Sequence, residues 1–215
     1  LIGGKLLYLL VDLPWLMDHL GGMLQDPLSL LRYLSSGFVF YGGLIGLLVA
    51  VFFYFYRHPS LILEEYLQPC MPAFPIFYCF GRFGCFLAGC CYGAASNSLL
   101  ALPIYTQANP QVLVSRYPVQ LFEAGFNLLL FVSLFVLARR RRSGFVQLGF
   151  YLSMYGIFRF LIEWLRGDAV RGVWVLSTSQ WTSLLLVPVG LWMMKDSRFF
   201  LQWMDRLRNR KEEQE

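Results

Sequence analysis

Several long apolar runs decide what this chain can fold into. A helix needs about 20 apolar residues to cross the hydrocarbon core of a bilayer, and the chain holds several runs of that order. These runs lack the in/out alternation of barrel strands, and backbone groups inside hydrocarbon must be bonded internally. Since 57% of the residues are hydrophobic and only 14% are charged, a soluble globular protein is excluded. The sequence therefore predicts an all-α, polytopic transmembrane helical bundle.

The breaks between the apolar runs are polar or rich in proline and glycine, which marks turns. They divide the chain into six expected spans, at residues 1–17, 37–56, 68–93, 119–138, 145–165 and 176–194. The segment 94–118 has mixed polarity and contains prolines, so we expect a surface loop or a short interfacial structure there. The sequence opens with Leu1 inside an apolar stretch, and we expect a further segment to precede it.

The distribution of cations predicts the orientation, because Lys and Arg in short loops stay on the cytoplasmic side. With the run at 139–142 placed inside, alternation brings eleven cations to that side and four to the other. The C-terminus is then cytoplasmic, and segments 94–118 and 166–175 face outward. No basic face is interleaved with stacking aromatics, so a nucleic-acid partner is not expected.

The chain shows no internal repeat, and the sequence predicts one membrane-embedded domain over residues 1–195. We expect it to be a monomer surrounded by membrane lipids. Residues 196–215 form a basic tail, which we expect to lie as an interfacial amphipathic helix on anionic lipid.

Four charged residues remain within or near the expected spans, namely Arg82, Glu123, Arg159 and Glu163. A charge at the bilayer midplane costs about 2.5 to 3.5 kcal/mol on insertion scales, so such residues face the interior of the bundle. Three of these charged residues belong to polar stripes with helical spacing, because residues three or four positions apart share a helix face. The stripes comprise Tyr155, Arg159, Glu163 and Arg166 on one helix and Gln120, Glu123 and Asn127 on another.

Small residues form two further faces, where another helix or a lipid head group can approach closely. One face joins Arg82, Cys85, Gly89 and Gly93. The other contains Gly42, Gly43 and Gly46 beside Tyr41.

Two interpretations of the buried charges are open. In the first, Arg159 and Glu163 neutralise each other as an i, i+4 pair while Arg82 reaches outward. In the second, which we favour, the arginines form a basic pocket open to the outer leaflet. Its natural ligand is a phospholipid head group, because a guanidinium holds a phosphate through paired hydrogen bonds.

Four ordered motifs, FYGGLIG, GRFGCFLAGCCYG, RYPVQLFE and YGIFRFLIEWLRGD, resemble the prolipoprotein diacylglyceryl transferase family over roughly residues 26–195. The resemblance implies an enzyme of the bacterial inner membrane that needs no cofactor or metal. It would transfer the diacylglyceryl group of phosphatidylglycerol to the lipobox cysteine in a prolipoprotein signal peptide. Family members begin with another membrane helix, so a complete chain would have seven spans.

The resemblance also assigns residues to the reaction. Arg82 in the second motif and Arg159 in the fourth motif match arginines of the family, and both are natural holders of the departing phosphate. The remaining matches fall in the fourth motif and in the third motif. They are Tyr155, Glu163 and Arg166 in the former and Arg116, Gln120 and Glu123 in the latter.

The chain departs from the family pattern where a base and hydrogen-bonding partners are expected. Tyr41 stands for the motif histidine, Cys85 and Ala88 for two asparagines, and Cys90 for a glutamate. A phenol is a poor general base unless a nearby cation lowers its pKa. The candidate base is therefore Tyr41, Glu163 or Glu123, and the two carboxylates are expected mainly to orient arginines.

His19 and His58 are not expected to replace the missing base. His19 lies in a stretch that matches none of the motifs, and His58 falls in an inward loop.

The chain has five cysteines, of which Cys85, Cys90 and Cys91 are clustered. The spacing lacks the two C-x2-C pairs of a structural zinc site, and free cysteine packs as a small apolar residue. We expect packing, with a redox or metal role and covalent participation in transfer as alternatives. Cys85 is the candidate for the latter because it lies one turn from Arg82.

Two other functions are compatible with these features. One is a divergent paralogue that uses the same phospholipid cradle for another transfer. The other is a non-enzymatic membrane protein that binds lipid.

Overall fold

The computed structural model describes most of the chain, and the described residues fall into two compact units. The units are Leu1–Ile62 and Leu63–Glu215, and each is considered separately. The described residues are 2–14, 16, 17, 19, 26, 28, 33, 37, 40–58, 61–106, 109–166, 172, 173 and 176–196. The expected interfacial helix in the basic tail lies outside them, apart from Asp196.

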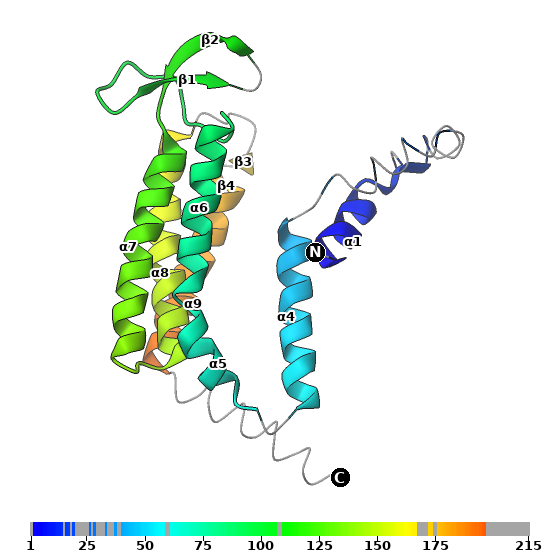
Figure 1. Cartoon of the computed structure of the whole chain (residues 1–215), viewed down its shortest axis with the longest axis vertical. Coiled ribbons are helices and arrows are strands. Elements are labelled where there is room, and N and C mark those ends of the chain that lie inside the picture. The colour runs from blue at the N-terminus through cyan, green and yellow to red at the C-terminus, as the bar shows by residue number, and fades with distance from the viewer. Residues whose placement is uncertain are drawn as a thin grey trace. The chain divides into compact units, whose positions relative to one another are not determined.

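Both units are mostly helical, which confirms the helical class (Figure 1). Three expected spans match observed helices within a few residues, namely 119–138, 145–165 and 176–194. The described helices are α1 (Ile2–Val11), α4 (Phe40–Arg57), α5 (Leu63–Cys70), α6 (Ala73–Leu87), α7 (Val119–Arg139), α8 (Gly144–Ile162) with a 3-10 turn η1 (Glu163–Leu165), and α9 (Thr178–Lys195).

In the second unit, α6, α7, α8 and α9 run side by side as a bundle (Figure 1). Small residues let α8 and α9 approach closely, as is usual for membrane helices. A Cβ added to Gly190 would contact Ser153 Oγ, and one added to Gly156 would lie 2.9 Å from a methyl group of Val187. Ser153 itself is fully buried, and its hydroxyl donates to the Gly149 carbonyl at 2.8 Å.

The segment expected to be a loop or short interfacial structure contains a β-hairpin, which the sequence analysis did not predict. Strand β1 (Leu102–Thr106) pairs antiparallel with β2 (Asn109–Arg116), with Ile104 opposite Val114. A shorter pair, β3 (Gly172–Val173) and β4 (Leu176–Ser177), precedes α9. Figure 1 shows the hairpin at the end of the bundle where α6 ends and α7 begins.

The expected span 68–93 is wrong at both ends. Helix α5 begins earlier, and α5 and α6 meet at a bend of 40°. The break coincides with Pro72, which lacks an N–H for the helical ladder. Helix α6 ends at Leu87, and Gly89 follows with a φ of 66°, which cannot continue a right-handed helix.

Six spans are not confirmed, because by length and composition two described helices can cross a membrane. These are Val119–Arg139 and Gly144–Leu165, and the bent pair α5–α6 makes a third if it counts as one span. Helix α1 and the segment Ile45–Arg57 of α4 are shorter apolar helices.

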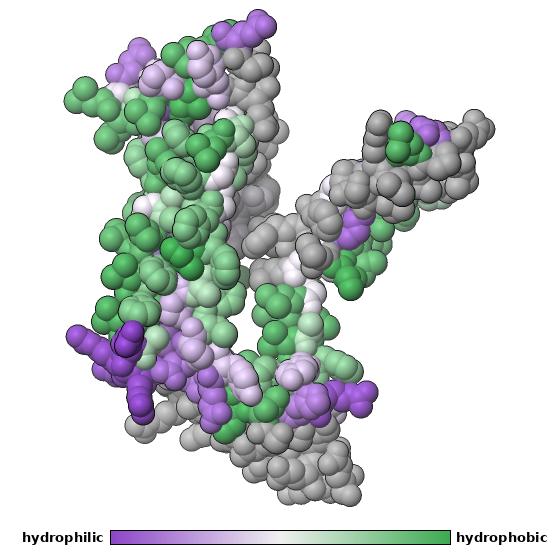
Figure 2. Space-filling view, in the orientation of Figure 1, coloured by the Kyte–Doolittle hydropathy of each residue, from purple (hydrophilic) through white to green (hydrophobic). Residues whose placement is uncertain are grey.

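The surface of the bundle suits a bilayer. Apolar side chains cover its middle, while polar side chains gather around the hairpin and around the turn after α7 (Figure 2). Large apolar side chains such as Phe77, Phe80 and Leu129 are 66–74% exposed. Exposure of this kind over contiguous helices marks a surface that lipid or another apolar partner covers.

In the first unit, α1 packs against α4 through glycines. A Cβ added to Gly42 would contact the Gly3 carbonyl oxygen, and one added to Gly46 would lie 3.2 Å from the Gly3 Cα. The small-residue face of α4 therefore receives a helix at Gly42 and Gly46, whereas a Cβ added to Gly43 would meet nothing within 4 Å.

Candidate functional site

The buried charges of the second unit gather at one end of the bundle. Because neighbouring helices alternate in direction, the last turns of α6 and α8 lie beside the first turns of α7 and α9. Arg82 lies near the end of α6, Glu123 near the start of α7, and Arg159 near the end of α8. This is also the end that carries the β1–β2 hairpin (Figure 1).

Glu123 is the centre of the group, because both arginines bind its carboxylate. Arg82 Nε pairs with Glu123 Oε2, and Arg159 Nη1 lies 3.2 Å from Glu123 Oε1. The two guanidiniums, which come from positions far apart in the sequence, thus meet at one carboxylate. The interpretation in which Arg82 reaches outward without a partner is wrong.

The group is shielded from solvent. The Glu123 side chain is 1% exposed, and the side chains of Arg82 and Arg159 are 17% and 11% exposed. Removing a carboxylate from water costs several kcal/mol, which only close, hydrogen-bonded cations offset. With Glu163, the group holds two cations and two anions, so its formal charge is zero.

Arg159 has two further partners. Its Nη2 lies 2.9 Å from Glu163 Oε2 and donates to Ser179 Oγ at 2.9 Å. The expected i, i+4 pair is therefore present, but it is one edge of a network that also holds Glu123.

The expected helical stripe is wrong at its outer end. Glu163 begins the 3-10 turn η1, and Arg166 follows it in an extended conformation with a ψ of 135°. The backbone N–H of Arg166 donates to the Glu163 carbonyl at 3.1 Å, so Arg166 follows Glu163 around the turn instead of continuing the helix face.

Tyr78 belongs to the site, although the sequence analysis did not select it. Its hydroxyl oxygen accepts from Arg82 Nε at 3.0 Å and from Arg82 Nη2 at 2.8 Å. The Tyr155 hydroxyl lies 3.2 Å from the same oxygen. The signal was available, since Tyr78 precedes Arg82 by four positions on one helix. Ser179 offered no such signal, because only the tertiary fold brings α9 to Arg159.

A second set of expected residues surrounds the loop after α6. Gln120 is fully buried, and its Nε2 donates to the Cys90 carbonyl. Arg116 donates to the Gly93 carbonyl at 3.4 Å, and its guanidinium lies 4.6 Å from the centre of the Tyr92 ring. Gln120 and Arg116 thus hold this loop through its backbone carbonyls.

Cys85, in the last turn of α6, lies close to Gly89 and Cys90 in this loop. The Cys90 N–H donates to the Cys85 carbonyl at 3.1 Å, and Gly89 is buried. Burial raises the pKa of the Cys90 thiol to about 11.

Three of the expected site residues belong to the first unit. Tyr41, Gly42 and Gly43 lie in the first turn of α4. Gly42 packs against α1, while the Tyr41 side chain lies outside what the structure describes.

The arrangement leaves donors for an anion. The contacts with described residues use Nε and Nη2 of Arg82 and Nη1 and Nη2 of Arg159. Within the described part of the chain, Nη1 of Arg82 and Nε of Arg159 take no part in these contacts, so both can donate to an anion. Two guanidiniums held in fixed positions suit a phosphate better than flexible lysines would.

Comparison with known proteins identifies the family of this chain. The family described as prolipoprotein diacylglyceryl transferase matches residues 1–195. The chain is 33% identical over 199 residues to the phosphatidylglycerol-prolipoprotein diacylglyceryl transferase of Clostridium tetani, covering 93% of this chain and 76% of the relative.

Two other relatives give the same result. Identity is 30% over 212 residues with phosphatidylglycerol-prolipoprotein diacylglyceryl transferase 2 of Clostridium perfringens, covering 99% of this chain and 77% of the relative. It is 34% over 195 residues with the Streptococcus sanguinis enzyme of that name, covering 89% and 72%. The chain belongs to the prolipoprotein diacylglyceryl transferase family.

Proposed function

We propose that this protein transfers the diacylglyceryl group of phosphatidylglycerol to the lipobox cysteine of prolipoproteins. The observation that carries the proposal is the meeting of Arg82 and Arg159 at the buried carboxylate of Glu123. Family membership supports it, since the relatives' names specify phosphatidylglycerol and prolipoprotein.

The reaction is a displacement at a glycerol carbon. The cysteine sulfur forms a C–S bond to the diacylglyceryl carbon while the C–O bond to the phosphate breaks. The products are a thioether and glycerol phosphate, and the thiol proton passes to a base. Charge grows on the leaving phosphate, so preorganised donors lower the barrier.

Arg82 and Arg159 supply those donors. Glu123 and Glu163 hold the two guanidiniums in place, and Tyr78 and Ser179 fix their remaining N–H groups. This pairing also prevents two uncompensated cations from lying buried before the lipid binds.

The base that accepts the thiol proton is Tyr41 or Glu163 in this proposal. Tyr41 occupies the position of the family histidine, whereas Glu163 already pairs with Arg159 at 2.9 Å. The variants Tyr41→Phe and Glu163→Gln distinguish them. Because Glu163→Gln also removes a partner of Arg159, Tyr41→Phe decides: loss of kcat with KM unchanged assigns the base to Tyr41, and an unchanged kcat excludes Tyr41.

Residues from all four sequence motifs are proposed to bind substrate. An apolar pocket of about 330 Å³ between α8 and α9 offers space for hydrocarbon, lined by Ile157, Phe160, Leu161, Leu184, Val187 and Pro188. The proposed substrate-binding residues are Gly42, Gly43, Cys85, Gly89, Arg116, Gln120, Glu123, Tyr155 and Arg166.

The proposal includes the domain organisation, membrane location, oligomeric state and orientation of the enzyme. Residues 1–195 act as one domain of the bacterial inner membrane, as a monomer, with the site end facing outward and the C-terminus in the cytoplasm. The arginine run at 139–142, at the turn between α7 and α8, supports this orientation.

Reconstitution of the full chain in vesicles tests the function. Phosphatidylglycerol vesicles and a lipobox peptide should yield a peptide heavier by one diacylglyceryl group, detected by mass spectrometry. Phosphatidylethanolamine vesicles are the matched control. No product from a folded, inserted protein that nevertheless binds phosphatidylglycerol would establish a lipid-binding protein instead.

A further inference from the structure

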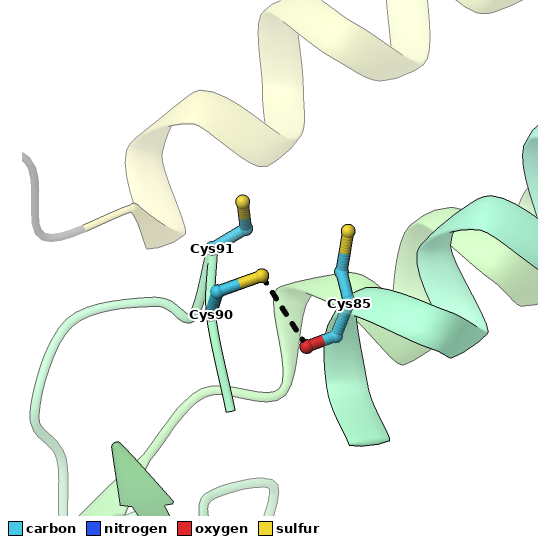
Figure 3. A group of neighbouring side chains, drawn as sticks. All are labelled: Cys85, Cys90 and Cys91. Carbon is cyan, nitrogen blue, oxygen red and sulfur yellow. Dashed lines mark hydrogen bonds between the residues drawn. The ribbon is translucent and has the colours of Figure 1, made fainter. Parts of the chain in front are cut away.

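Three thiols converge at the end of α6. The sulfur atoms of Cys85, Cys90 and Cys91 all lie within 4.8 Å of one another. Figure 3 shows the side chain of Cys90 pointing toward Cys85, and the Cys90 thiol donates to the Cys85 carbonyl at 3.6 Å. All three cysteines are free, and Cys91 is exposed.

The backbone is shaped to bring these thiols together. Cys91 has a φ of 60°, in the left-handed region that residues other than glycine rarely adopt. Gly89, two positions earlier, has a φ of 66°. Strained backbone of this kind persists where the surroundings hold it, and it clusters at functional sites. Here Gln120 on α7 anchors the strained loop by donating to the Cys90 carbonyl.

The donor set selects a class of ion. Thiolates are soft ligands that favour Cu(I) and Zn(II) over Mg(II) and Ca(II). A metal–sulfur distance of about 2.3 Å places three sulfurs of a planar site about 4 Å apart, which the observed separations accommodate. Among the described residues, the group holds three ligands, one fewer than a closed structural zinc site requires.

We propose that Cys85, Cys90 and Cys91 bind one soft, thiophilic metal ion, for which monovalent copper is the best match. Each thiol loses its proton to solvent as its sulfur binds, and no atom changes oxidation state. The ion links the last turn of α6 to the following loop, one helical turn from Arg82. This site shares Cys85 with the proposed substrate-binding residues, but it goes beyond the proposed transfer reaction and does not depend on it.

Protection from alkylation tests the proposal with the unmodified full chain. The reduced protein is treated anaerobically with a thiol alkylating agent, with and without one equivalent of Cu(I), and each cysteine is quantified by mass spectrometry. We expect Cu(I) to protect Cys85, Cys90 and Cys91 while Cys70 and Cys79 react to the same extent in both samples. Equal labelling of the cluster in both samples, or equal protection by Mg(II), overturns the proposal.

Matched variants provide a second measurement. Against a competing Cu(I) chelator, Cys91→Ser should weaken binding by about tenfold or more, whereas Cys70→Ser and Cys79→Ser should leave it unchanged. The control cysteines lie in α5 and α6, outside the cluster. Equal losses in all three variants, or a disulfide within the cluster of the anaerobically isolated protein, contradict a metal site.

Discussion

Arg159 on α8 donates to Glu123 on α7 at 3.2 Å, across 36 positions of sequence. The other oxygen of the same carboxylate pairs with Arg82 on α6. A single buried anion therefore aligns two cations from two other helices, and the proposed chemistry depends on that alignment.

The two arginines are expected to be essential for transfer. Arg82→Lys and Arg159→Lys keep the charge but lose the planar fork that binds a phosphate through two bonds. We expect each to lower kcat on the order of 10²-fold, the loss typical of removing one transition-state donor. Initial rates with phosphatidylglycerol vesicles provide the measurement.

Arg139→Lys is the matched control for these substitutions, because Arg139 is an exposed arginine at the far end of α7. Its rate should equal that of the unmodified protein. Unchanged rates in the Arg82 and Arg159 variants would remove the basis of the proposed site.

Glu123→Gln should impair both stability and activity. The substitution leaves Arg82 and Arg159 with one counter-ion fewer in a buried setting, and breaking such a pair costs about 3–5 kcal/mol. The midpoint of denaturant unfolding in detergent should fall accordingly. Glu65→Gln, at an exposed glutamate of α5, is the control and should not shift the midpoint.

Tyr78→Phe tests a residue identified from the structure. The change removes the acceptor of two Arg82 hydrogen bonds, at 3.0 and 2.8 Å, while keeping the ring. We expect kcat to fall about tenfold, because a misplaced guanidinium stabilises the leaving phosphate less well. KM should change little if Tyr78 only positions Arg82. A normal kcat in a folded Tyr78→Phe protein would show that Arg82 needs no such support.

The close contact between α8 and α9 should not tolerate an added methyl group. Gly190→Ala places a Cβ against Ser153 Oγ and the Gly149 carbonyl, both on α8, the helix that carries Arg159. Overpacking of this kind costs about 1–3 kcal/mol. Gly125→Ala on α7 makes the same change where nothing lies within 4 Å, and it should not destabilise the protein. Thermal unfolding in detergent should show a lower midpoint for Gly190→Ala than for Gly125→Ala, and equal midpoints would contradict the prediction.

The sequence by itself determined the class and the charged members of the site. Long apolar runs require helices in a bilayer, and a charge inside such a run requires a partner, which singled out Arg82, Glu123, Arg159 and Glu163. These inferences use local composition and helical spacing, so they need no knowledge of how helices pack.

The spacing of residues along the chain did not predict features that depend on distant contacts or on backbone geometry. The hairpin formed by β1 and β2 depends on pairing between strands that each look like loop, and the end of α6 depends on the left-handed conformations of Gly89 and Cys91. Neither is encoded by hydrophobic periodicity.

Only the tertiary structure decided which charges meet. Helical spacing places Arg159 beside Glu163, but it cannot show that Glu123 lies between two arginines or that Ser179 reaches Arg159. Those contacts depend on which helices are neighbours and how closely they approach, and glycines on α8 and α9 set that distance. The physical reason is that a buried ion pair forms where packing brings its members together, whatever their separation along the chain.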